Sequence, residues 1–249
     1  MSLNISFDRR TFLIGSGSLA GSLFAKAGSA TESAGEALFA SAFKRHDGSH
    51  GVVFLGEQGQ VLYEFALPGR GHDVTICRKT QIGVVFARRP GNFTLIFDLK
   101  GFSPHQILTA RDGRHFYGHG VFSVDGKLLY ATENDFDSGT GVIGVYDATD
   151  RFKWVGEFPS YGIGPHEVLF DPLSNYLVVA NGGIETHPDF GRAKLNIPTM
   201  EPSLAFIDPM TGELVEKHTL PANLHKLSTR HMAAGNNGRI IFGCQFEGN

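Results

Sequence analysis

Short apolar runs separated by turn residues dominate the chain from about residue 50 onward. Residues 51–55 and 61–65 are two such runs, and they flank a polar segment rich in glycine and glutamine. Runs of this length, rich in β-branched and aromatic residues and bounded by glycine, are typical of β-strands joined by tight turns. The pattern predicts strands rather than long amphipathic helices.

A histidine precedes such a run at four places, and three of these histidines are evenly spaced. His119 lies 47 residues after His72, and His166 lies 47 residues after His119. His231 begins a fourth and less regular copy. Periods of 40 to 50 residues with four strands each are typical of β-propeller blades. In the clearest copy, strands are predicted at residues 120–124, 127–132, 141–147 and 153–158.

We therefore predict an all-β fold, a β-propeller of four-stranded blades, that occupies residues 46–249. A repeated aspartate supports this register, because Asp98, Asp147 and Asp208 each close a predicted third strand. The strands suffice for about four to five blades, and an incomplete array leaves strand edges exposed. We interpret this chain as the N-terminal part of a longer protein.

Composition and charge exclude several classes of partner. The 249 residues carry a net charge of −3, with 22 basic and 25 acidic side chains, so no basic surface for nucleic acid is expected. Cys77 and Cys244 are the two cysteines, which gives no cysteine-based metal motif. The sequence leaves open whether they are free thiols.

The N-terminal segment resembles an export signal. Arg9 and Arg10 precede Phe12 and Leu13 in a weakly apolar, glycine- and serine-rich stretch, which is typical of a twin-arginine signal peptide. We assign residues 1–30 to this signal and 31–45 to a linker, and we predict a periplasmic protein with no membrane span after cleavage. The alternative is a disordered tail with a chance arginine pair.

The repeats place the polar residues with potential chemistry on one face. If each histidine begins the inner strand of its blade, the four form an arc at the mouth of the central channel, near the ends of the second strands. Imidazoles arranged in this way suit iron, copper or zinc, and nearby carboxylates can complete or orient the site. The alternative is a structural motif repeated in every blade. The candidates at the channel mouth are His72, His119, His166, His231, Glu133 and Glu167, and those on the rim and the insertion are Arg88, Asn134, Asp135, Asn181, Glu185 and His187.

One blade carries a long insertion. Residues 182–202 separate its predicted second and third strands and include three prolines. Loops of this length in compact repeats often bind partners or ligands. The alternative is a surface loop that has no function and costs little stability.

Three strings carry a resemblance to a known family. Residues 117–120, 131–134 and 164–167 read Tyr-Gly-His-Gly, Ala-Thr-Glu-Asn and Gly-Pro-His-Glu. With the arginine pair and the 47-residue register, the chain resembles the bacterial "domain of unknown function" family fifteen-thirteen. The resemblance implies a periplasmic seven-bladed propeller whose genes often lie beside those of an imelysin-type iron-regulated protein and a di-haem thiol-oxidoreductase-like protein. It supplies no catalytic residues.

These observations lead to one functional hypothesis and two alternatives. The first is a metal- or partner-binding component of a periplasmic iron-acquisition system. A metal-assisted hydrolase or lactonase-like enzyme is the second, and a non-catalytic interaction scaffold is the third. A hydrolase would bring Glu133, Asp135 or Glu167 within coordination reach of the central cavity. The identity of the metal, the substrate and the oligomeric state stay open.

Overall fold

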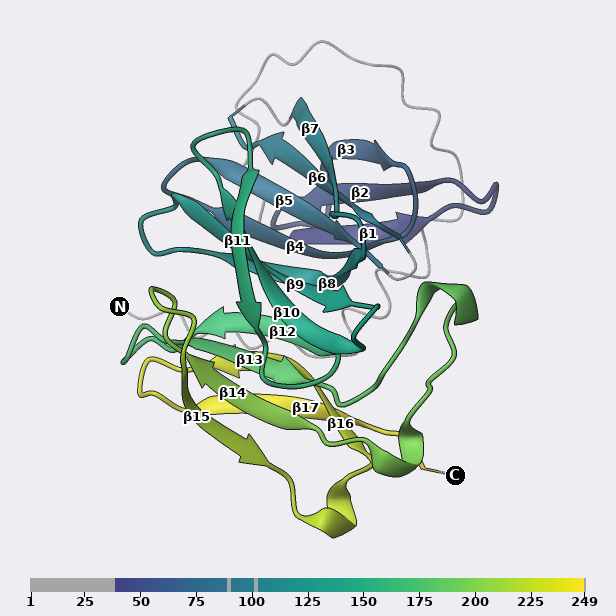
Figure 1. Cartoon of the computed structure of the whole chain (residues 1–249). Helices are drawn as coiled ribbons and strands as arrows, with labels where there is room; N and C mark the ends of the chain where they lie inside the picture. The colour runs from purple at the N-terminus through teal and green to yellow at the C-terminus, as the bar shows by residue number, and fades with distance from the viewer. Residues whose placement is uncertain (1–38, 89–90, 101–102, 249) are drawn as a thin grey trace. The chain divides into compact units, whose positions relative to one another are not determined.

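Seventeen β-strands in five antiparallel sheets make up the part of the chain that the structure describes (Figure 1). This computed structural model describes residues 39–88, 91–100 and 103–248. The predicted signal peptide, residues 1–30, lies outside these ranges. No α-helix occurs within them, and no helix there is long and apolar enough to cross a membrane.

Strands that follow one another along the chain pair within each sheet. The first sheet contains β1 (Phe39–Lys44), β2 (His50–Leu55) and β3 (Val61–Leu67). The second contains β4 (Gly71–Cys77), β5 (Ile82–Ala87), β6 (Phe93–Asp98) and β7 (Ser103–Thr109). The third contains β8 (Arg114–Phe122), β9 (Leu128–Asp135), β10 (Thr140–Asp147) and β11 (Lys153–Pro159).

The fourth sheet contains β12 (Pro165–Phe170), β13 (Leu177–Asn181), β14 (Ser203–Ile207) and β15 (Leu214–Thr219), and the fifth pairs β16 (Leu227–Ala234) with β17 (Ile240–Phe246). Three short 3₁₀ helices lie in the connections, η1 (Pro188–Phe190), η2 (Ile197–Thr199) and η3 (Ala222–Leu224). The first strands adjoin one another, with β4 against β8, β8 against β12 and β12 against β16. These first strands are the inner strands of the blades.

The repeated aspartates hold the turns after the third strands. Asp98 Oδ1 accepts a hydrogen bond from the Lys100 N–H at 2.7 Å, and Asp147 Oδ1 accepts one from Thr149 at 2.8 Å. Asp208 makes the same contact with the Met210 N–H. Aspartate stabilises such turns because its carboxylate reaches the backbone N–H two residues ahead.

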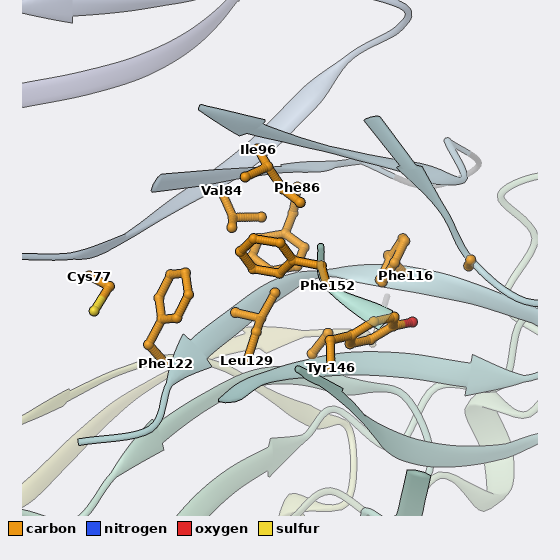
Figure 2. Close-up of a cluster of buried hydrophobic side chains, with 11 residues drawn as sticks. Cys77, Val84, Phe86, Ile96, Phe116, Phe122, Leu129, Tyr146 and Phe152 are labelled. Carbon is orange, nitrogen blue, oxygen red and sulfur yellow. The ribbon is translucent and has the colours of Figure 1, made fainter. Parts of the chain in front are cut away.

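Apolar side chains fill the spaces between successive sheets. One cluster joins Val84 and Phe86 of the second sheet to Phe116 and Leu129 of the third (Figure 2). Similar clusters join the first sheet to the second and the third to the fourth. Burial of apolar surface between sheets thus fixes the spacing of neighbouring inner strands.

Two features of the predicted register need correction. β1 occupies residues 39–44 of the segment predicted to be a linker, because its backbone pairs with β2 from Phe39 to Lys44. β8 begins at Arg114, so His119 lies well inside its strand instead of at its start. The insertion lies where it was predicted, between β13 and β14.

Candidate metal centre

Four histidines from four different sheets meet at one point. His72, His119, His166 and His231 come from β4, β8, β12 and β16, and each offers a ring nitrogen within 4.8 Å of the others'. The ring centroids of His72 and His119 lie 4.7 Å apart, and those of His166 and His231 lie 4.9 Å apart. The predicted arc of histidines is therefore a single cluster.

A β-bulge on the inner strand accompanies every one of these histidines. The register of β4 shifts between Gly71 and Val74, and that of β8 shifts between Phe116 and Gly120. β12 shifts between residues 165 and 167, and β16 shifts between 229 and 232. In each case the extra residues lie on the inner strand, where a bulge bends the strand and redirects a side chain. The bulges explain how four strands direct imidazoles to a common point.

A glycine makes room for the approach of two rings. Gly118 lies in the β8 bulge with φ +113°, and a Cβ atom at this position would lie 2.4 Å from Cδ2 of His72. A side chain there would meet both backbone strain and a direct clash with the imidazole. Gly118 therefore permits His72 and His119 to share the centre.

The four imidazoles differ in exposure. His119 is buried, with 3% of its surface exposed, whereas the side chain of His231 is 62% exposed. Burial, together with the neighbouring His119 and Arg88, lowers the pKa of His72 to about 3. Burial likewise lowers the pKa of His166 far below its ordinary value. Neutral imidazoles are the form that binds metals.

Two carboxylates lie near the Nδ1 atoms of two rings. Nδ1 of His119 lies 3.4 Å from Oδ2 of Asp73 and 3.9 Å from Oε1 of Glu167. Nδ1 of His231 lies 3.3 Å from Oε2 of Glu167, which also accepts the Met232 N–H. A carboxylate at Nδ1 favours the tautomer with its proton there and leaves Nε2 free to ligate. Both ring nitrogens of His119 are buried and neither makes a hydrogen bond among the described residues, so its approach to Asp73 and Glu167 is a charge contact only.

His166 is oriented by a cation instead. Nη1 of Arg230 donates to Nδ1 of His166 across 3.4 Å, a long hydrogen bond. Nη2 of the same guanidinium donates to Glu247, which anchors it. A metal bound at Nε2 of His166 requires the ring proton on Nδ1, so this weak contact would be lost on binding.

Glu133 is not part of the cluster. Its side chain is fully buried on β9, on the face that carries Leu129 and Ala131, and the Tyr146 hydroxyl donates to Oε1 at 2.5 Å. Oε2 has no hydrogen-bond partner within the described ranges. Burial raises the pKa of Glu133. The hydrogen bond from Tyr146 lowers it by less, and the resulting pKa is about 7. Glu133 thus belongs to the packing between the second and third sheets.

The remaining second-strand residues hold the fold together. Asn134 Nδ2 donates to the carbonyl of Thr186 at 3.1 Å and ties the insertion to β9. Asn181 Nδ2 donates to the Ser160 carbonyl at 2.8 Å. Asp135 forms an ion pair with Arg114 at 2.9 Å. None of these groups joins the histidine cluster.

The predicted insertion residues lie beside a different cavity. His187 caps η1 by accepting the Asp189 N–H, and its ring packs against Phe136 at 5.5 Å. The Glu185 N–H donates to Asn196 within the loop. His187 lines a cavity of about 330 Å³ that also includes Arg111 and His115. The insertion therefore contributes no ligand to the histidine centre.

Sequence reasoning missed two charged groups that contact the histidines of the centre, Asp73 and Arg230. Asp73 follows His72 directly in the sequence, and Arg230 directly precedes His231, so adjacency to a candidate ligand was the available signal. Arg88, predicted on the rim, lines a cavity of about 640 Å³ together with His72 and Asp73. This cavity adjoins the histidine centre.

The fold defines a class of protein. Successive antiparallel sheets with adjoining inner strands are a β-propeller-type fold. The structure entitled "Kuenenia stuttgartiensis Hydrazine Synthase" has a similar fold, with a TM-score of 0.60 and 18% identity over 82% of this chain. This chain spans 55% of the length of that protein, and at this identity the likeness concerns the fold alone. The predicted all-β propeller class is confirmed.

The chain belongs to the family described as "Protein of unknown function (DUF1513)", which matches residues 65–249. This match confirms the family resemblance of the three sequence strings. It covers all four histidines of the cluster. No curated protein matches the chain.

We predict that Gly118→Ala destabilises the protein more than the same substitution at a glycine where the new side chain causes backbone strain but no clash. A left-handed φ costs an alanine roughly 1–2 kcal/mol, and at Gly118 the clash with His72 adds to this cost. The matched control is Gly48→Ala, since Gly48 has φ +88° and no neighbouring atom within 4 Å of a new Cβ. Urea denaturation measures both free energies of unfolding. Equal losses would show that Gly118 is not needed for the approach of His72.

We also predict that Glu133→Gln removes one contribution to the pH dependence of stability, a loss that accompanies deprotonation of the buried Glu133 as the pH rises. The folded-state pKa of about 7 exceeds the ordinary value of 4.5, so the folded state binds the extra proton. The contribution of Glu133 to the free energy of unfolding is therefore fully present below pH 4.5. It is lost, by up to about 3 kcal/mol, as the pH rises through 7. Denaturant titrations at pH 4.5 and 8 should show that the change in stability from pH 4.5 to pH 8 is more favourable in Glu133→Gln than in the unmodified chain, by up to about 3 kcal/mol. The exposed Glu213→Gln serves as the control, and an unchanged difference for Glu133→Gln would contradict the prediction.

Proposed function

We propose that this protein binds one transition-metal ion through the four-histidine centre. The observation that carries the proposal is the convergence of four imidazoles within 4.8 Å. Four nitrogens around a tetrahedral ion with bonds of about 2.0–2.1 Å lie about 3.4 Å apart, so a small closure of the rings completes the site. Imidazole ligands suit zinc, copper and iron.

The contacts of the rings support a ligand role over a structural one. A structural histidine directs its ring nitrogens to a hydroxyl or a turn carboxylate within its own blade, and buried polar atoms are normally satisfied. Here the rings approach one another across blades, and buried Nε2 of His119 has no partner among the described groups. An ion at the centre would satisfy this nitrogen.

The carboxylates favour metal binding over metal-assisted hydrolysis. Glu133 and Asp135 are engaged with Tyr146 and Arg114, away from the cluster. Glu167 faces the Nδ1 atoms of two histidines and accepts a backbone N–H, which is the position of an orienting group. A hydrolase would need a carboxylate that reaches a metal-bound water.

The physiological setting is also a proposal. The family resemblance supports a component of an iron-acquisition system with a protein partner, and the arginine pair at residues 9–10 supports export to the periplasm. A centre made of imidazoles is compatible with iron as well as with copper or zinc. The alternative is an interaction scaffold that binds no metal. Measurements of metal binding distinguish the two.

We predict that the chelator-treated full chain binds one equivalent of Zn²⁺ or Cu²⁺ in titration calorimetry. His231→Gln removes an exposed ligand with little effect on packing, and it should weaken binding by more than the roughly 10- to 100-fold that outer-sphere changes cost. The control is His218→Gln on β15, whose side chain is comparably exposed at 55%. Absence of stoichiometric binding in the unmodified chain would overturn the proposal.

We further predict that Glu167→Gln weakens metal binding by roughly 10- to 100-fold without removing a ligand. The amide keeps an acceptor for the Met232 N–H but loses the charge that orients His119 and His231. The matched control is Glu216→Gln, because Glu216 pairs with the exposed His218 at 3.1 Å. Calorimetry on both variants measures the change. Equal affinities would show that Glu167 does not position the ligands.

A further inference from the structure

The histidine centre adjoins a cavity that is large enough for a small molecule. The cavity has a volume of about 640 Å³ and is lined by residues of β1 and β4, including His72. Small-molecule sites commonly have volumes of about 300–1,000 Å³. Because His72 belongs to both the cluster and the cavity wall, the cavity adjoins the metal position on the side of His72.

Positive charge dominates the wall of this cavity. Lys44, Arg70 and Arg88 line it, and Asp73 is the acidic residue among its lining residues. Asp73 lies 3.4 Å from His119, so part of its charge is directed toward the imidazole. Lys44 and Arg70 are exposed. A concave wall with several charges of one sign concentrates ions of the opposite sign.

The ligand set of the centre adds to this preference. Four neutral imidazoles leave the charge of a divalent ion uncompensated in its first coordination sphere. Asp73 and Glu167 offset part of this charge from outside the coordination sphere, at Nδ1 of His119 and His231. An anionic ligand bound directly to the ion is therefore favoured on the side of the cationic cavity.

We propose that the cavity lined by Lys44, Arg70 and Arg88 delivers a small carboxylate anion to the metal as an additional ligand. This inference rests on the proposed metal centre and names the class of molecule that the centre takes. The carboxylate oxygen is a fifth ligand, added to the four imidazoles on the side of the ion that faces the cavity. The cationic side chains hold the rest of the anion.

The test uses the full chain loaded with Cu²⁺ and titrated with azide, an anion whose binding to copper changes the absorption spectrum. Formate then competes as the carboxylate probe at constant ionic strength, set with a non-coordinating salt. Arg70→Gln and Lys44→Gln should each weaken azide and formate binding by roughly fivefold, because each removes one cation from the cavity. Arg239→Gln removes an exposed arginine elsewhere and should leave both affinities unchanged.

Copper content and circular dichroism are measured on every variant, so a loss of anion binding is separated from a loss of metal or of folding. A chain that binds copper but shows no azide or formate binding overturns this inference and leaves the metal centre intact. Unchanged anion affinity in Arg70→Gln and Lys44→Gln overturns the role of the cavity. A chain that takes up no metal overturns the proposed function and this inference together.

Discussion

The histidine centre depends on a single local distortion that recurs in four inner strands. A regular strand sends successive side chains to opposite faces, and the pairing of each inner strand with its neighbour fixes which face a residue occupies. The extra residues in β4, β8, β12 and β16 break this alternation where the histidines lie. The apolar clusters between sheets then set the distance between inner strands. Distortion within each strand and packing between sheets are both required before four rings can meet.

The electrostatic environment follows from the same geometry. Burial keeps His72 and His166 neutral by lowering the pKa of both, and neutral rings can lie close together without repulsion. Carboxylates occupy the outer side of His119 and His231, while cations line the adjoining cavity. Negative charge therefore lies at Nδ1 of two rings, and cations outnumber the single acidic residue in the lining of the adjoining cavity. This separation allows one centre to hold a cation and admit an anion.

The sequence predicted the repeats better than it predicted the side chains within them. The bounds of β2 and β10 agree with the predicted runs at residues 51–55 and 141–147 to within one residue, because apolar residues between turns are a strong strand signal. The bulges were not predictable, since a bulge depends on the register between two strands, and His119 was therefore placed at a strand start. Glu133 was misplaced at the channel, although its alternation with Leu129 and Ala131 indicated the packed face of β9. The two-residue periodicity of β9 thus indicated the position of Glu133 better than the spacing of the histidines did.

A centre assembled from four sheets also changes how the fold is stabilised. In repeat architectures each unit contacts chiefly its neighbours, so stability is mostly a sum of local terms. His72 and His231 belong to the second and fifth sheets, yet their ring centroids lie 6.0 Å apart. An ion bound between them would link sheets that are distant in the chain, and its binding free energy would add to the free energy of unfolding. The same four bulges that disturb the regular pairing of the inner strands would then support a cross-link that holds the sheets together.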